Sequence, residues 1–421
     1  MRRRETRLGE SMGGVDLETL ADLWSTPLYV YSAGSIRKRI DELKAALLGL
    51  DAVICYAAKA NSNSAILGLM AESGLGADIV SVGELRRCLR SGIAPGRIVF
   101  SGVGKTGSEM AEALDAGIWK FNVESCEELC TLQEVAHARD AIAQVAVRIN
   151  PDVDAQTHGK ISTGKSENKF GVGIEEARRW FASAADLPNL RLSGLHVHIG
   201  SQIMNLGPFR LALEHIARFW RVLADSGHTI DSIDVGGGLG VCYRAGHDVP
   251  ILAVDYVAVI RSALADFKGK VILEPGRHLV AEAGLLLTRV IRVKQTGTRS
   301  FLIVDAAMND LLRPSLYEAW HDVVALHDES RPTVRYDIVG PVCETGDTFG
   351  VDRELPESRS GELLAIMAVG AYGASMASTY NSRPLAAEVL VDGSRHSVVR
   401  RRQSQSEMVA GERRSRTWET A

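Results

Sequence analysis

A regular alternation of strand-like and helix-like segments dominates the middle of the chain. Short apolar runs rich in β-branched residues recur there, and each ends in a polar or glycine-rich segment that leads into a helical pattern. Eight runs have this form: residues 52–57, 78–81, 97–101, 119–123, 144–149, 194–199, 232–235 and 270–273. Eight strand–helix units over residues 34–280 match the ~250 residues of a (β/α)8 barrel. The alternation therefore predicts this α/β fold, with a doubly wound open sheet as the alternative.

The segments between the runs carry helix signals of their own. Helical patterns cover residues 62–71, 83–91, 108–116 and 208–224. Three helices are expected to begin where a hydroxyl residue is followed three positions later by glutamate, because the two side chains can then cap each other's backbone N–H groups. These pairs are Ser81 with Glu84, Thr106 with Glu109, and Ser125 with Glu128.

The pattern changes after residue 280. Long helical patterns become few, and turn residues separate the apolar runs at residues 285–294, 301–305, 334–339, 363–367 and 388–391. This favours a mostly β second domain, to which a strand-like segment at residues 26–31 can add. The predicted organisation is an N-terminal segment with a joining strand (1–33), a barrel (34–280), a C-terminal β domain (281–402) and a flexible tail (403–421).

Composition excludes several classes of protein. Lys and Arg number 48 against 52 Asp and Glu, a net charge of −4, whereas a dedicated nucleic-acid binder carries a basic excess. Six cysteines are too few and too scattered for a disulfide scaffold. No segment reaches the ~18 apolar residues of a membrane span, and the basic N-terminus lacks the apolar stretch of a signal peptide. We expect a cytoplasmic protein with reduced thiols that binds neither nucleic acid nor membrane.

Residues able to do chemistry gather at the ends of the apolar runs. Each of the following closes or follows one run: Lys59, Asp78, Asn122, Arg148, His198, Gly236 and Glu274. Active sites of (β/α)8 barrels lie at the carboxyl ends of the strands. This coincidence indicates an enzyme.

Two glycine-containing segments resemble phosphate-binding loops. Residues 99–106 end in Gly-Lys-Thr like a P-loop, but the required first glycine is Val99, inside a predicted strand, so we expect an ordinary loop there. The motif Asp234-Val-Gly236-Gly237-Gly238-Leu-Gly240 is more informative. Its three consecutive glycines leave backbone N–H groups unobstructed, which suits one phosphate group, although a tight turn also needs glycine.

Two histidines, His196 and His198, are expected on one face of a strand because strand side chains alternate with period two. Paired barrel histidines can bind a metal, but such a site needs further ligands at other strand ends, and the remaining histidines do not supply them. A histidine that stacks on a flat ring beside a phosphate-binding Ser201 fits better. Packing of both rings for structure is the third interpretation.

Charged residues close the first and last runs. Lys59 could be a solvated surface lysine, or it could be desolvated with a lowered pKa and available for a Schiff base. Glu274 and Arg277 could form a structural ion pair. Alternatively, Glu274 could pair with a protonated ring nitrogen while Arg277 holds a carboxylate.

Six motifs occur in the order found in one known family. They are Tyr56-Ala-Ala-Lys59-Ala-Asn61, His196-Val-His198-Ile-Gly-Ser201-Gln, Asp234-Val-Gly-Gly-Gly-Leu-Gly, Glu274-Pro-Gly-Arg277, Gly340-Pro-Val-Cys343-Glu344-Thr-Gly-Asp347 and Gly370-Ala-Tyr372-Gly. Together they resemble the alanine-racemase-like group IV decarboxylases, which use pyridoxal 5′-phosphate and combine a barrel with a β domain. The resemblance is strongest to members that act on meso-diaminopimelate, and it covers residues 26–402.

The resemblance implies a cofactor site at the mouth of the barrel. Lys59 would hold the cofactor aldehyde covalently, His198 would stack on the pyridine ring, and Glu274 would keep the ring nitrogen protonated. Cys343 is the implied proton donor, and no metal is expected. Other implied cofactor contacts are Asp78, Ser201, Gly236, Gly237, Gly238, Pro275, Gly276, Arg277 and Tyr372.

The resemblance also implies a substrate and a partner. The residues implied to grip the distal end of meso-diaminopimelate are Arg277, Arg313, Tyr317, Glu344 and Tyr372. Two arginines match the non-reacting carboxylate and a glutamate matches the non-reacting ammonium. Loss of the carboxylate at the D centre would give L-lysine and CO2, the last step of lysine biosynthesis. The family forms homodimers in which Cys343 reaches the other subunit's site, and Lys169 pairs across the dimer with the position of Asp347.

Other functions remain open at the level of sequence. A related enzyme could decarboxylate ornithine, arginine or carboxynorspermidine, although two arginines favour a dicarboxylic substrate. From different classes, the chain could be a metal-dependent barrel hydrolase or a non-catalytic regulator built on the same scaffold.

Overall fold

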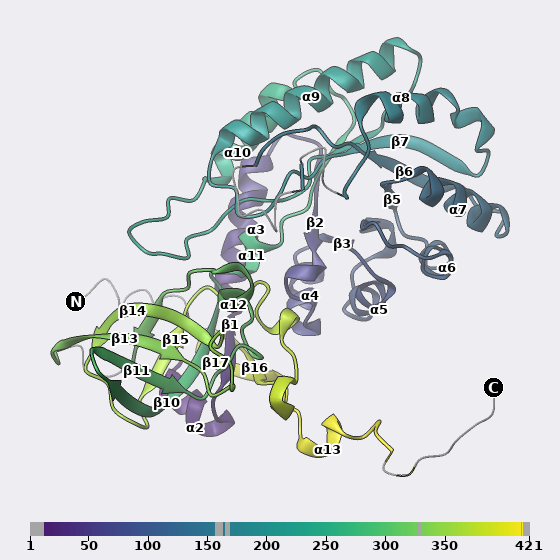
Figure 1. Cartoon of the computed structure of the whole chain (residues 1–421). Helices are drawn as coiled ribbons and strands as arrows, with labels where there is room; N and C mark the ends of the chain where they lie inside the picture. Colours follow the sequence, from purple (N-terminus) through teal and green to yellow (C-terminus); the bar gives the residue numbers. More distant parts are fainter. Residues whose placement is uncertain (1–11, 156–162, 165–168, 327–329, 414, 416–421) are drawn as a thin grey trace. The chain divides into compact units, whose positions relative to one another are not determined.

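The computed structural model describes residues 12–155, 163–164, 169–326, 330–413 and 415. The chain divides into two compact units, which are described separately (Figure 1). We call the unit made of residues 33–283 and 370–375 the barrel unit. The remaining residues, 1–32, 284–369 and 376–421, make up the β unit.

Eight parallel strands close into a barrel in the first unit. In chain order they are β2 (Ala52–Ala57), β3 (Gly76–Ile79), β4 (Ile98–Phe100), β5 (Lys120–Val123), β6 (Ala143–Arg148), β7 (Leu190–His196), β8 (Ser232–Asp234) and β9 (Lys270–Leu273). Each strand pairs with the next, and β9 pairs with β2. The predicted (β/α)8 barrel is thus confirmed and the open sheet is excluded.

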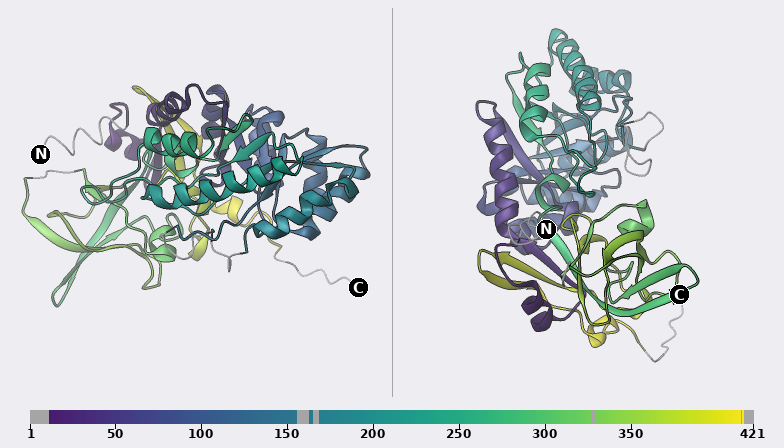
Figure 2. Two further views of the ribbon diagram at one scale, coloured as in Figure 1. Left: turned by 90° about the horizontal axis from the view of Figure 1, so that it is seen from above. Right: turned by 90° about the vertical axis from the view of Figure 1, so that its left-hand side faces the viewer.

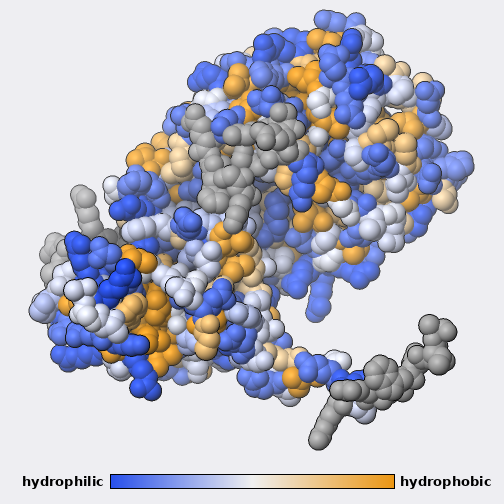
Figure 3. Space-filling model, viewed as in Figure 1, coloured by the Kyte–Doolittle hydropathy of each residue, from blue (hydrophilic) through white to orange (hydrophobic). Residues whose placement is uncertain are grey.

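Helices alternate with these strands and form the outer layer of the unit (Figures 1 and 2). They are α3 (Ala33–Leu47), α4 (Ser64–Glu72), α5 (Val82–Arg90), α6 (Gly107–Asp115), α7 (Cys126–His137), α8 (Ile174–Ala182), α9 (Leu206–Asp225), α10 (Ala253–Ala263) and the short α11 (Arg277–Val280). Helix α9 buries apolar residues such as Phe209, Leu213 and Ile216, spaced three or four apart. The opposite sides of such helices are polar, and Figure 3 shows mainly hydrophilic side chains on the visible face of the barrel unit.

Two predicted strand boundaries were wrong, and capping explains one of them. Strand β3 ends at Ile79, not at residue 81, because the Ser81 side chain accepts the backbone N–H of Glu84 and begins helix α5. Strand β7 ends at His196, so His198 lies in the loop that follows and does not share a strand face with His196. The other two predicted caps, Thr106 and Ser125, are present at the starts of α6 and α7.

The β unit is built on a nine-stranded sheet that is curved in Figures 1 and 2. Its strands are β1 (Leu28–Ser32), β10 (Gly284–Thr296), β11 (Arg299–Val304), β12 (Val323–Ala325), β13 (Thr333–Val339), β14 (Thr348–Pro356), β15 (Leu363–Ile366), β16 (Ala387–Asp392) and β17 (Arg395–Arg400). The N-terminal strand β1 lies between β10, antiparallel to it, and β16, parallel to it. Helices in this unit include α2 (Leu17–Trp24), α12 (Arg313–Tyr317) and α13 (Gln405–Met408).

Two segments differ from the expected organisation. Residues 370–375, expected in the β domain, group with the barrel because Tyr372 N–H donates to Ala60 O at 2.8 Å and Asn61 Nδ2 donates to Gly370 O at 3.1 Å. The segment expected to be a flexible tail contains α13, whose first turn is capped by Ser404. In the part of the chain that the structure describes, no helix is long and apolar enough to cross a membrane.

Candidate active site

Lys59 follows the first barrel strand directly. Strand β2 ends at Ala57, and a single 3-10 turn, Ala58–Ala60, places Lys59 at the carboxyl end of the barrel. Its Nζ donates to Asp78 Oδ2 at 2.7 Å, while 38% of the Lys59 side chain stays accessible. A ligand can therefore reach an amine whose position is fixed by a buried carboxylate.

The charge state of Lys59 differs from the sequence expectation. Burial alone would lower the pKa of Lys59, but the charges of Asp78 and Glu274 raise it, and the net result lies above the ordinary value. The expectation of a lowered pKa was wrong because it could not include carboxylates contributed by other strands. Burial and the charge of Glu274 raise the pKa of Asp78, and the ion pair with Lys59 opposes this rise.

His198 packs against the glycine turn. Its Nδ1 accepts the backbone N–H of Gly237 at 3.1 Å, so a neutral ring carries its proton on Nε2. Burial and the positive charges of Arg148 and Lys59 hold the pKa of His198 well below its ordinary value. The ring is therefore neutral at pH 7 and has a fixed tautomer.

The glycine turn after β8 has no room for side chains. A Cβ atom added at Gly236, Gly237 or Gly238 would come within 3.0 Å of a backbone carbonyl oxygen, and the first and third residues have φ of +68° and +109°. The same close approach affects Gly276, where a Cβ would lie 3.0 Å from the Cβ of Ala60. Glycine is required here both for conformation and for space.

Arg277 supplies a positive charge next to this turn. It is 6% exposed, and its Nη2 donates to Ser201 Oγ at 2.9 Å. Its guanidinium group donates to the Tyr243 hydroxyl and lies 4.8 Å from the centre of the Tyr372 ring. Pro275 contributes its carbonyl oxygen, which accepts Ala57 N–H at 3.2 Å. Tyr243 was not identified from the sequence, where it follows the glycine motif without a distinctive pattern.

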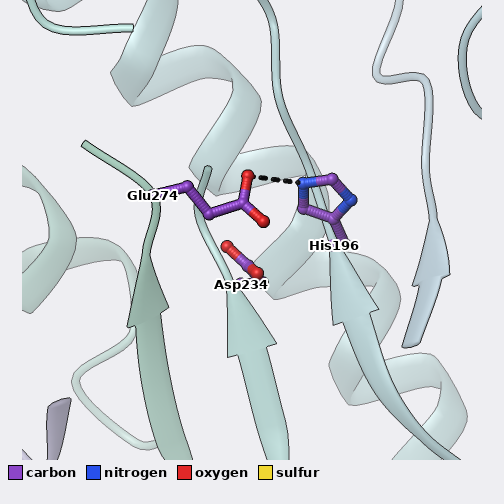
Figure 4. Close-up of side chains that lie close together, drawn as sticks. All are labelled: His196, Asp234 and Glu274. Atoms are coloured by element: carbon purple, nitrogen blue, oxygen red, sulfur yellow. Dashed lines mark ion pairs between the residues drawn. The ribbon is translucent and has the colours of Figure 1, made fainter. Parts of the chain in front are cut away.

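Glu274 is the centre of a buried polar cluster (Figure 4). Its Oε1 accepts from Asn122 Nδ2 at 3.2 Å and from Ser101 Oγ at 3.4 Å, and its Oε2 lies 3.3 Å from His196 Nε2. The Asp234 carboxyl group points toward the same carboxylate in Figure 4. Of these residues, the sequence analysis gave no role to Ser101 or Asp234.

The Glu274 cluster corrects one argument against a metal. His196, Asp234 and Glu274 come from the ends of three neighbouring strands, and their ligand atoms lie within 4.8 Å of one another. Further ligands at other strand ends therefore exist, and both are carboxyl groups, not histidines. Spacing alone does not separate a metal site from a carboxyl pair that shares a proton.

The charges of the two carboxyl groups in this cluster are linked. Burial raises the pKa of Glu274, but His196 and Lys59 lower it by more than burial raises it. The net pKa of Glu274 therefore lies below the ordinary value. Burial and the charge of Glu274 raise the pKa of Asp234 well above its ordinary value. At pH 7, Glu274 is therefore ionised and Asp234 is protonated.

The remaining predicted site residues lie in the β unit. Cys343 and Glu344 are exposed in the loop between β13 and β14, and Glu344 Oε2 accepts from the Tyr380 hydroxyl at 3.1 Å. Asp347 is buried and accepts the N–H groups of Met308 and Val342. Its carboxylate therefore holds the loop that carries Cys343.

Arg313 begins helix α12 and is 5% exposed; Tyr317 is the last residue of the same helix. Arg313 Nη1 donates to His321 Nε2 at 2.7 Å, and His321 Nδ1 lies 2.8 Å from Met367 O. The carbonyl fixes the proton of His321 on Nδ1, so Nε2 is free to accept from the arginine. His321 was not identified from the sequence because its partners lie on different elements.

Known proteins are similar to this chain over most of its length. A family profile described as the pyridoxal binding domain of pyridoxal-dependent decarboxylases matches residues 33–281. Diaminopimelate decarboxylase from Pseudomonas aeruginosa is 50% identical over 399 residues, covering 95% of both chains. The same enzyme from Zymomonas mobilis is 46% identical over 403 residues, covering 95% of this chain and 96% of the relative.

Solved structures are similar over the same length. Diaminopimelate decarboxylase from Helicobacter pylori complexed with L-lysine has 43% identity and a TM-score of 0.91, covering 94% of this chain and 99% of that one. The enzyme from M. jannaschii in co-complex with L-lysine has 37% identity and a TM-score of 0.90, covering 95% and 94% of the two chains.

Proposed function

Because the chain belongs to the diaminopimelate decarboxylases, a family of pyridoxal 5′-phosphate-dependent carboxy-lyases, we propose that it removes the carboxylate at the D centre of meso-diaminopimelate. The products are L-lysine and CO2, and the reaction is the last step of lysine biosynthesis. The observation that carries the proposal is the accessible amine of Lys59, fixed by Asp78 at the mouth of a closed barrel.

The residues of the barrel unit fit a phosphorylated pyridine aldehyde. A side chain at Gly236, Gly237 or Gly238 would meet a backbone oxygen, so this turn presents its own backbone without side chains. Arg277 brings a buried positive charge suited to an anionic group of a ligand. Asp78 Oδ1 is buried and lacks a hydrogen-bond partner among the described residues, so the site retains an acceptor for a ligand group.

We assign the cofactor contacts as follows. Lys59 holds the aldehyde carbon. The phosphate would be surrounded by Ser201, Gly236, Gly237, Gly238, Gly276 and Tyr372, with Pro275 and Arg277 beside them. His198 stacks on the ring, a role that suits a neutral imidazole whose tautomer is fixed by Gly237. Glu274, ionised and buried, accepts from the ring nitrogen. When bound, the cofactor supplies the electron sink for the bond that breaks.

Two side chains handle protons in the proposed reaction. Lys59 must lose its proton before it can act as a nucleophile, and Asp78 Oδ2, at 2.7 Å, fixes the position of the amine until then. Cys343 then returns a proton to Cα of the substrate after CO2 has left. The exposed position of Cys343 on a loop held by Asp347 supports this assignment, since a donor must be able to reach the substrate.

Substrate selection is proposed to depend on opposite charges. Arg277 and Arg313 match the distal carboxylate, and Glu344 matches the distal ammonium. Tyr317 and Tyr372 complete the set. The contact between His321 Nε2 and Arg313 supports the assignment, because it fixes the guanidinium in one orientation. Ornithine lacks a distal carboxylate, and a decarboxylase for it would have no use for two arginines.

The homodimer and the cytoplasmic location are part of the same proposal. The proposed homodimer shares its active sites between two subunits, and Cys343 is assigned as the contribution of the second subunit. Pairing of Lys169 with the partner's Asp347 is proposed with it. Reduced cysteines are consistent with a cytoplasmic enzyme.

Borohydride reduction of the cofactor-loaded protein tests the proposal. A reduced adduct is expected on the peptide that contains Lys59, and the protein should convert meso-diaminopimelate to lysine and CO2. An adduct on another lysine would overturn the site. Consumption of ornithine without conversion of diaminopimelate would overturn the substrate, and Arg313→Ala should weaken substrate binding without weakening cofactor binding.

A further inference from the structure

The carboxylate of Glu274 accepts hydrogen bonds from two side chains, and a histidine lies close on another side. Asn122 Nδ2 and Ser101 Oγ donate to Oε1 at 3.2 and 3.4 Å, and His196 Nε2 approaches Oε2 at 3.3 Å. Glu274 and His196 are 5% and 1% exposed. Water cannot reorganise around such a group, so its neighbours determine where it points and how it is charged.

Asp234 is the neighbour of Glu274 whose hydrogen bonding is incomplete unless its carboxyl group is protonated. Its Oδ1 accepts Gly236 N–H at 2.9 Å, whereas its Oδ2 has no donor among the described residues. The side chain is 1% exposed and points toward Glu274 (Figure 4). The ligand oxygens of Asp234 and Glu274 lie within 4.8 Å of each other. Two buried carboxylates this close cannot both be ionised, and a proton on one of them turns their repulsion into a hydrogen bond.

The surroundings decide which of the two carboxyl groups carries the proton. Glu274 has two neutral donors and an imidazole around it, and all three favour its ionised form. Asp234 has one backbone donor, the N–H group of Gly236, on its Oδ1. The proton therefore belongs on Asp234.

We propose that Asp234 and His196 are positioning residues for the cofactor: protonated Asp234 donates a hydrogen bond to Glu274, His196 fixes the other side, and Glu274 stays ionised and aimed at the ring nitrogen. The proposal rests on the assignment of Glu274 in the proposed function and extends it to a second layer of side chains. It also explains the two carboxyl groups without a metal ion, because one shared proton joins Asp234 to Glu274.

Two substitutions at Asp234 test whether this residue acts as a hydrogen-bond donor or as a negative charge. Asp234→Asn keeps an acceptor for Gly236 and a donor toward Glu274, so it imitates the protonated acid. The valine side chain of Asp234→Val has a similar shape but contains neither a hydrogen-bond acceptor nor a donor. We expect the cofactor dissociation constant of Asp234→Asn to stay within about threefold of wild type, and that of Asp234→Val to rise roughly tenfold or more, as for a lost hydrogen bond to a charged group.

The absorption spectrum of the bound cofactor reports on the charge of Glu274 and does not respond to a change in packing alone. Loss of an ionised Glu274 should shift the absorption maximum in Asp234→Val but not in Asp234→Asn. His196→Gln retains one donor and should shift it less than His196→Leu. Ile233→Val, a buried change on the same strand, controls for packing and should leave both spectrum and affinity at wild-type values.

Three results would overturn the inference. Equal weakening by Asp234→Asn and Asp234→Val would show that Asp234 acts as an anion. An unshifted spectrum in Asp234→Val with a normal thermal melt would show that it does not act on the ring. Stoichiometric binding of Zn²⁺ to the cofactor-free protein, lost in Asp234→Asn, would make the cluster a metal site. A wild-type protein that binds no cofactor would instead reject the proposed function.

Discussion

The reactive amine of the site is controlled by carboxylates that are distant in sequence. Lys59 lies 2.7 Å from Asp78, and the charges of Asp78 and Glu274 outweigh the burial that alone would lower the pKa of Lys59. An amine must be neutral to attack an aldehyde, so the cofactor-free site holds Lys59 in its protonated, unreactive form. Asp78 is therefore the group that keeps the proton on Lys59, although burial raises the pKa of Asp78 itself.

Asp78→Asn should make Lys59 lose its proton at a lower pH. The substitution keeps the size of the side chain and removes the negative charge that holds the proton on the amine. Acetylation of the cofactor-free protein across a pH series, read by mass spectrometry, should label Lys59 at lower pH in the variant than in wild type. The exposed Lys294 provides the internal reference. Labelling of Lys59 that is unchanged, or moved to higher pH, would contradict the role of Asp78.

A second titrating residue affects stability instead of chemistry. His278 on α11 is 7% exposed, and burial together with the charge of Arg39 lowers its pKa to about 4. Because the ordinary pKa is 6.5, the unfolded chain takes up the proton first as the pH falls. The contribution of neutral His278 is therefore complete above about pH 6.5 and is lost as the pH falls toward 4, by at most about 3 kcal/mol.

His278→Gln should flatten this part of the stability profile, since glutamine does not titrate. Urea unfolding of both proteins at pH 7.5 and pH 4.5 gives the comparison. Carboxyl groups shared by the two proteins contribute equally, so only the difference between the profiles reports on His278. Parallel profiles would show that the histidine does not change protonation in this range.

At the scale of elements, the segments that follow the barrel strands position the residues of the site. The glycine turn after β8, the short α11 after β9 and the 3-10 turn after β2 bring backbone and side chains of three strand ends together. Gly237 lies so close to the backbone carbonyl of Glu274 that a Cβ atom would not fit between them. A shift of the glycine turn would therefore also shift Glu274, the residue assigned to the ring nitrogen. A side chain at Gly237 would disturb both.

Gly237→Ala should weaken cofactor binding by roughly tenfold or more, because its Cβ would meet backbone that cannot move without shifting Glu274. Gly104→Ala is the matched control. It lies in the P-loop-like segment, has open space where its Cβ would be, and should leave binding unchanged. Fluorescence titration with pyridoxal phosphate measures both. A weakened Gly104→Ala would mean that the P-loop-like segment takes part after all.

At the scale of the whole molecule, local patterns predicted most of the fold. Barrel strands and helix caps depend on neighbours within a few residues, so periodicity and the Ser81, Thr106 and Ser125 signals were sufficient. Residue types at strand ends likewise indicated an enzyme. The family resemblance, not periodicity, assigned the cofactor.

Interactions between strands were not predictable in the same way. The contact of Asp234 with Glu274 joins residues 40 positions apart, and nothing in the glycine motif shows that its first residue faces a carboxylate. Tyr243 and His321 were missed for the same reason, because each acts on an arginine from another element. The raised pKa of Lys59 also arises from charges on other strands. A sequence pattern locates a residue on an element but does not show what it meets.

The assembly provides the final prediction, because the proposed site takes Lys59 from one subunit and Cys343 from the other. Lys59→Ala and Cys343→Ala should each be inactive as purified dimers. If the subunits are exchanged by mild denaturation and refolding of an equal mixture, half of the dimers are mixed and carry one intact site of two. Activity should recover to about a quarter of wild type. Recovery no greater than the sum of the two variants, with exchange verified by a mass tag, would place Cys343 in the site of its own subunit.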